Sequence, residues 1–95
     1  MNNLEQRFIE FSSEIQDICS HISIRKNEEG LYILAFGLKR LHSIELRKVN
    51  ELFVVEFWLG VIAEEEEVVE VLSFDRIETA FVATKRWLEK DVDSL

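Results

Sequence analysis

Cysteine and histidine, which often act as nucleophiles, bases or metal ligands, are scarce in this chain. The sequence has one cysteine, Cys19, and two histidines, His21 and His42. A lone cysteine cannot close an internal disulfide. A zinc site needs three or four ligands, for which neither the Cys-x-x-Cys nor the His-x-x-x-His spacing occurs. We expect Cys19 to be a buried thiol on the first helix and His42 to be solvated at a polar bend. The sequence therefore predicts no catalytic residues, no metal site and no cofactor.

Glycine and basic residues are also few, and proline is absent. The three glycines are scattered along the chain, so no glycine-rich loop that could hold a phosphate is predicted, which argues against nucleotide binding. With 11 Lys and Arg against 19 Asp and Glu, the formal net charge is −8. Such a field repels nucleic acid and anionic membranes and favours basic protein partners.

No apolar segment is long enough to cross a membrane. The longest run, FVVEFWLGVI at residues 53–62, covers about half of the ~20 residues that a bilayer requires. The first residues, MNNLEQRF, show no basic stretch followed by an apolar one, so nothing in them marks the chain for secretion. Together with the lone cysteine, this predicts a protein of the cytoplasm.

The same run, residues 53–62, is predicted to be the central strand of a sheet. It is rich in β-branched and aromatic residues, and it is apolar on both faces at the two-residue period of a strand. A strand that is apolar on both sides needs paired neighbours on both edges, and its sheet needs a cover on at least one face.

Segments with helical or strand periodicity surround this run. An apolar stripe from Leu4 to Ile18 predicts a first helix that ends near Ser20 and packs on the protein's own sheet. A second helix is predicted to begin at Asp75 and to fray from Asp91 onward. The other strand patterns cover about 22–25, 31–38, 44–49 and 68–72.

These elements predict an α+β fold. It is a two-layer sandwich with an N-terminal helix, an antiparallel meander of four to five strands and a C-terminal helix, in a single domain over residues 1–95. The pattern leaves open whether both helices cover one face of the sheet or one helix covers each face. A monomer is favoured over a homodimer, unless a bare sheet face pairs two copies.

The densest charge in the sequence is acidic and comprises Glu64, Glu65, Glu66, Glu67 and Glu70. One interpretation is a solvated loop whose charge protects an exposed strand edge. The other is a docking patch, because adjacent like charges repel one another and a basic protein surface relieves that repulsion. A calcium site is a weaker interpretation, since calcium loops alternate their carboxylates and include glycine.

The run AEEEEVVE at Ala63–Glu70 lies in a small, strongly acidic chain, in which Trp58 and Tyr32 are candidate aromatic anchors. In size, charge and this run the chain resembles the immunity proteins that bacteria keep beside their secreted toxins, many of them nucleases. The resemblance implies a non-enzymatic bacterial protein whose acidic patch occupies the basic cleft where the toxin binds its substrate. The expected partner is a basic protein, and the expected partner-binding residues are Glu64, Glu65, Glu66, Glu67, Glu70, Trp58 and Tyr32.

Two other classes of protein compete with this hypothesis. An acidic intracellular chaperone or adaptor for a secreted effector is similar in size and charge, and such proteins usually dimerise. An enzyme is disfavoured, because the sequence contains no constellation of residues that could carry out catalysis.

Overall fold

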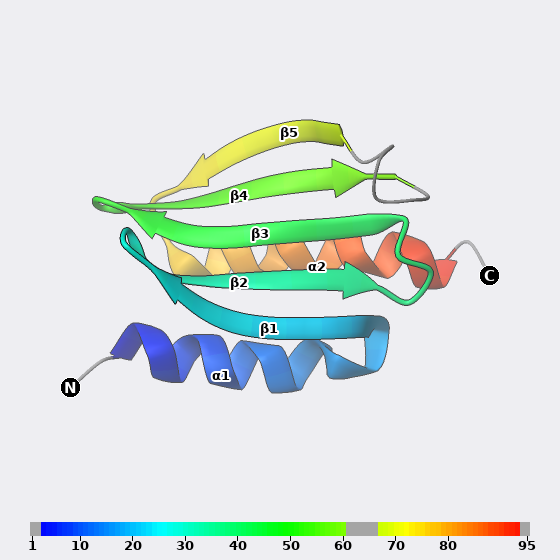
Figure 1. Ribbon diagram of the computed structural model, residues 1–95, viewed down its shortest axis with the longest axis horizontal. Helices are drawn as coiled ribbons and strands as arrows, with labels where there is room; N and C mark the ends of the chain where they lie inside the picture. The colour runs from blue at the N-terminus through cyan, green and yellow to red at the C-terminus, as the bar shows by residue number, and fades with distance from the viewer. Residues whose placement is uncertain (1–2, 61–66, 94–95) are drawn as a thin grey trace.

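The computed structural model describes residues 3–60 and 67–93 of the chain. Within these residues, five strands form one sheet in the order β1-β2-β3-β4-β5, and every neighbouring pair is antiparallel (Figure 1). The predicted α+β meander between an N-terminal and a C-terminal helix is thereby confirmed. The elements are α1 (Asn3–Ile15), η1 (Gln16–Ile18), β1 (Cys19–Asn27), β2 (Gly30–Gly37), β3 (His42–Val49), β4 (Leu52–Leu59), β5 (Glu67–Phe74) and α2 (Ile77–Asp93).

Short turns determine the meander. Two residues separate β1 from β2, and Gly30 at the end of this turn has a φ of 119°. Asn50 begins the turn between β3 and β4 with a φ of 57°. Tight hairpin turns need positive φ at such positions, which glycine and asparagine adopt more readily than other residues. Because a two-residue turn reverses the chain directly, β1 pairs with β2 and β3 pairs with β4.

The core lies on one face of the sheet, which we call the covered face. Cross-strand pairs place Ile33, Leu46 and Val55 in one row, and Ala35, Ile44 and Phe57 in the next. These six side chains are at most 4% exposed. Alternation along each strand therefore puts the largest apolar set of β2, β3 and β4 on the same side.

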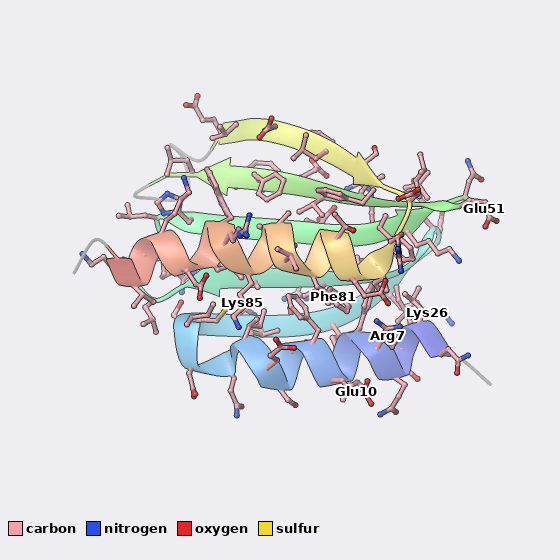
Figure 2. All side chains as sticks on the ribbon, turned by 180° about the vertical axis from the view of Figure 1, so that it is seen from behind. Arg7, Glu10, Lys26, Glu51, Phe81 and Lys85 are labelled. Atoms are coloured by element: carbon pink, nitrogen blue, oxygen red, sulfur yellow. The ribbon has the colours of Figure 1, made fainter. Side chains whose placement is uncertain are left out.

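Both helices cover this face. Figure 1 shows α2 behind the sheet, and Figure 2, from the other side, shows α2 in front of it with α1 alongside β1. The rings of Phe11 and Phe81 stack with their centroids 4.0 Å apart, and Arg7 donates to Glu78 over 2.9 Å, so α1 and α2 contact each other. Phe8 of the predicted stripe is fully buried. The question left open by the sequence is thus settled: the described helices lie on one face and leave the opposite face without a helix.

Several predicted boundaries differ from the structure. The first helix ends at Ile15, and Cys19 is the first residue of β1, where its backbone is extended, instead of part of the helix. The strand predicted over residues 53–62 is β4, which has paired neighbours on both edges as expected, but β3 is the middle strand. Val61 and Ile62, the end of that predicted strand, lie outside the described residues.

Candidate functional site

The side of the sheet opposite the helices is the candidate functional surface, and we call it the open face. It is turned toward the viewer in Figure 1. Its side chains alternate with those of the core along β2, β3 and β4. By register, its members are His21, Ser23 and Arg25 of β1, Tyr32, Leu34 and Phe36 of β2, Ser43, Glu45 and Arg47 of β3, Val54, Glu56 and Trp58 of β4, and Val68, Val71 and Ser73 of β5.

The open face carries several large apolar side chains, although no helix covers it. Tyr32, Leu34, Phe36 and Trp58 are only half-buried, and Val71 is 52% exposed. A sheet face turned toward water normally presents alternating polar side chains. Partly exposed aromatic and aliphatic side chains beside charged ones are instead typical of a protein–protein interaction site.

Three charged residues lie at the centre of this face. Glu45 on β3 is directly opposite Glu56 on β4, and Arg47 is on the same side of β3 as Glu45. The Arg47 guanidinium donates to Glu45 over 2.9 Å and also to Glu56. Like charges opposite one another on neighbouring strands are destabilising unless a counter-charge lies between them. Since one guanidinium serves two carboxylates, this acidic triad carries a net negative charge when both are ionised.

The surroundings of Glu45 in the acidic triad change its pKa. Burial raises the pKa of Glu45, and the nearby carboxylate of Glu56 raises it further, while Arg47 acts in the opposite direction with a smaller effect. The ionised form of Glu45 is therefore destabilised, because its environment supplies too little water and too little positive charge to the carboxylate.

A pocket of about 190 Å³ adjoins this triad, lined by Leu34, Phe36, Ser43, Glu45 and Trp58. Ser43 is paired with Phe36 on one side and with Trp58 on the other, so a small side chain lies between two large rings. Ser43 is only 6% exposed and forms the floor of the pocket. The pocket combines apolar and aromatic walls with one carboxylate at its side.

Replacing Glu45 by glutamine is expected to preserve the fold and to raise its stability at neutral pH. Because the pKa of Glu45 is raised, the folded state binds the proton more tightly than the unfolded state, and ionisation of Glu45 opposes folding. Stability contributed by this group should increase as the pH falls through its folded-state pKa. The glutamine variant should lose that increase, as thermal melts between about pH 4 and 8 can show.

The matched control for this comparison is Glu51→Gln, since Glu51 is exposed at the turn between β3 and β4. Its melts should follow those of the wild type. A Glu45→Gln variant that is less stable than wild type at pH 7 would mean that the bond from Arg47 outweighs burial and the repulsion from Glu56.

The structure does not bring the predicted partner-binding residues onto one surface. Tyr32 and Trp58 both lie on the open face, paired with Arg47 and Ser43 respectively. Glu67 and Glu70 are exposed, but they are paired with Leu59 and Phe57, whose side chains point to the covered face. Glu64, Glu65 and Glu66 lie outside the described residues.

A β-bulge explains this separation. The pairing of β4 with β5 shifts between Phe57, which is opposite Glu70, and Trp58, which is opposite Val68. Val69 is therefore an extra residue on β5, and it reverses the alternation on its N-terminal side. With regular pairing, Glu67 would share the side of Trp58; the bulge turns it to the other side.

A second polar cluster, at the C-terminal end of α2, connects the helix to the strands of the open face. Asp91 is fully buried, and it accepts backbone N–H bonds from Lys39 (2.9 Å), Leu41 (3.2 Å) and His42 (3.1 Å). Nδ1 of His42 lies 2.6 Å from the same carboxylate. Two expectations are thereby wrong: His42 is not a solvated histidine, and α2 does not fray at Asp91.

This cluster, together with Trp87, positions the strands behind the open face. Nε1 of Trp87 donates to the carbonyl oxygens of Ser43 (3.0 Å) and Trp58 (3.2 Å), which belong to β3 and β4. A Cβ added to Gly37 would clash with the Asp91 carboxylate, so that position needs glycine. The cluster is therefore a structural support, in which a carboxylate completes the hydrogen bonds of a turn.

Cys19 does not have the properties of a nucleophile. Burial and the charge of Asp91 raise the pKa of its thiol to about 11, which disfavours the reactive thiolate. Among residues 3–60 and 67–93, no cluster of three or more His, Cys, Asp or Glu side chains could hold a metal ion. Within the same residues, neither helix has the length and apolar character needed to cross a membrane.

Comparisons with protein-family models, with curated proteins and with solved structures find no significant match to this chain. The fold and the chemistry of the open face therefore carry the functional argument.

Proposed function

We propose that this chain is a non-enzymatic binding protein that neutralises a basic partner protein, as a bacterial immunity protein blocks a toxin such as a nuclease. The observation that carries the proposal is the open face, an uncovered sheet surface with Tyr32, Phe36 and Trp58 around a net negative centre. Tyrosine and tryptophan are among the residues that contribute most to binding when a partner covers them.

The charge of the chain supports a basic partner. A net charge of −8 attracts a cationic protein over long range and speeds its encounter. Glu67 and Glu70 are exposed on β5, the strand next to that of Trp58, and Glu64, Glu65 and Glu66 precede them in sequence. In this proposal the acidic segment attracts cationic residues of the partner that would otherwise hold phosphate, and the open face supplies the apolar contact.

An acidic chaperone that dimerises through its bare sheet face is the second candidate, and the uncovered open face is the observation that favours it. Two copies packed face to face, however, would each present a net negative triad, and each chain carries a charge of −8. Burying like charges against each other is unfavourable. We therefore propose that the chain alone is a monomer, which sedimentation at micromolar concentration tests.

The function is tested by truncating the aromatic residues of the open face. The partner is first isolated by a pull-down with this chain, and the readouts are its dissociation constant and the inhibition of its activity. Tyr32→Ala combined with Trp58→Ala should weaken binding by at least about 30-fold, because two central aromatic contacts are lost. Inhibition should weaken in parallel.

The matched control is Val82→Ala, which removes a 50% exposed apolar side chain from α2, on the far side of the molecule from the open face. It should bind as the wild type does. A further variant with glutamine at Glu64, Glu65, Glu66 and Glu67 should associate more slowly, with less dependence on salt. Unchanged affinity of the Tyr32/Trp58 double variant, in a protein that still folds, would overturn the open face as the docking surface.

A further inference from the structure

We propose that the pocket between Phe36 and Trp58 binds an arginine side chain of the basic partner, with its guanidinium group against Glu45. This inference rests on the proposed function, that a basic protein docks on the open face. It adds a defined subsite and the chemistry of the group that fills it.

The shape of the pocket suits a flat group on a long stem. Phe36, Ser43 and Trp58 lie in one row across three strands, so the Cα atoms of the two aromatic residues are about 10 Å apart, or two strand spacings. The small Ser43 between them leaves the space of about 190 Å³. The apolar methylene stem of an arginine can lie against Leu34 and the rings while its charged end reaches the carboxylate.

The charge of the pocket selects a cation. Glu45 lines it, and Glu45 shares the single guanidinium of Arg47 with Glu56, so one negative charge of the triad has no counter-charge within it. The raised pKa of Glu45 has burial as its first cause and the carboxylate of Glu56 as its second. A second guanidinium counteracts both causes. Its N–H groups replace the hydrogen bonds of the water lost on burial, and its positive charge offsets the repulsion from Glu56.

Aromatic walls favour arginine over lysine. A guanidinium is planar, stacks on rings and donates two parallel hydrogen bonds to one carboxylate, whereas an ammonium group is compact and strongly hydrated. The open face already shows this contact within the chain, since the guanidinium carbon of Arg40 lies 4.7 Å from the centroid of Phe36. Arg40 is exposed on the turn before β3, outside the residues that line the pocket.

The test uses N-acetyl-arginine-N-methylamide as the probe and the equivalent citrulline compound as its neutral isostere. Isotope-labelled protein reports binding through the indole N–H of Trp58, which a Trp58→Phe variant assigns, and through the amides of Leu34, Ser43 and Glu45. The arginine probe should give saturable shifts with a dissociation constant of about 1–10 mM, as befits one side chain. The citrulline compound should bind at least fivefold more weakly.

Variants separate the carboxylate from the general negative charge of the chain. Glu45→Gln should reduce arginine binding to the level of citrulline, whereas Glu51→Gln, which removes the same charge from an exposed turn, should leave it unchanged. Arg40→Ala should keep or strengthen binding, because a neighbouring positive charge is removed. The amide spectrum of each variant shows whether it is folded.

The proposal is overturned if the arginine probe gives no saturable shift up to about 50 mM, if citrulline binds equally well, or if Glu45→Gln binds as the wild type does. Free arginine that binds far more tightly than the capped probe would make the pocket a small-molecule site. A dimer that Glu45→Gln dissociates would make the occupant a second copy.

These outcomes are distinct from those of the functional test, because the probe needs no partner. If the wild type binds the arginine probe but the Tyr32/Trp58 double variant still binds the partner normally, the pocket is an arginine site and the open face is not the docking surface. If the double variant binds the partner more weakly but the wild type does not bind the arginine probe, the open face is the docking surface and the pocket is not an arginine site.

Discussion

Phe57→Ala is expected to destabilise the protein by about 3–5 kcal/mol, the usual cost of emptying a buried aromatic site. Phe57 is 4% exposed and lies in the row of core residues that includes Ile44. Its ring also meets Trp87 edge to face, with centroids 5.5 Å apart. Alanine would leave a cavity between the sheet and α2, and neither layer can close it without moving the other.

The matched control for this variant is Leu59→Ala on the same strand and the same side. Leu59 is 38% exposed, so its truncation should cost less than about 1 kcal/mol. Denaturant melts of the two variants give the comparison directly. A loss below about 1 kcal/mol for Phe57→Ala would mean that β4 is not part of the core.

The elements of the fold were predictable because their signals are local. The alternation of Ile44 and Leu46 with charged residues predicts β3, and the hairpin at Gly30 follows from the need for positive φ. The end of the first helix was predicted too late, since Ile18 continues the apolar stripe although the chain has already left the α-helix at Ile15. A stripe indicates which side is buried, and it does not indicate where the backbone stops being helical.

The choice of the covered face was harder to predict. Both sides of β4 are apolar, and only Glu56 distinguishes them, because the side with Phe57 contains no charged residue in that strand. A single glutamate within an apolar run is a weak signal on its own. Its meaning becomes clear only when register places it opposite Glu45 and beside Arg47, and register depends on pairing along the whole sheet.

The position of the acidic residues also depends on strand register, which the sequence does not predict. The sequence names Glu67 and Trp58 together as partner-binding residues without placing them relative to each other. One bulged residue on β5 is enough to send their side chains to opposite sides of the sheet. A run such as EEVVEV contains no sequence pattern that predicts a bulge. The sequence alone therefore does not predict on which side of the sheet the glutamates lie relative to the aromatic anchors.

Asp91→Ala is expected to be among the most damaging single changes, with a loss of about 3–5 kcal/mol, because it leaves charge-assisted hydrogen bonds unmade in a buried site. The backbone N–H groups of Lys39, Leu41 and His42 all donate to this carboxylate. These donors lie 49 to 52 residues before Asp91 in the chain, so no local sequence pattern predicts the hydrogen bonds. Lys39 and Leu41 lie between β2 and β3, and His42 begins β3, so these bonds link the end of α2 to the strands of the open face.

Three further variants sharpen this test. Asp91→Asn should also destabilise, since an amide would present a donor to N–H groups that need an acceptor. Glu89→Ala, an acidic residue two positions earlier on α2, should cost under about 1 kcal/mol. Gly37→Ala crowds the same carboxylate without removing it, so it should lower stability even if Asp91→Ala proves too unstable to purify.

Hydrogen exchange distinguishes a loss of this support from a general loss of stability. In a folded Asp91 variant, the amides of Lys39, Leu41 and His42 should exchange faster than those at the centre of β3, such as Leu46. Partner binding should weaken as well, although Asp91 lies on the covered side, because the strands that carry Ser43 and Trp58 would lose part of their anchorage. An Asp91→Ala protein within about 1 kcal/mol of wild type, with unchanged exchange at these amides, would show that the buried carboxylate is not what holds the turn in place.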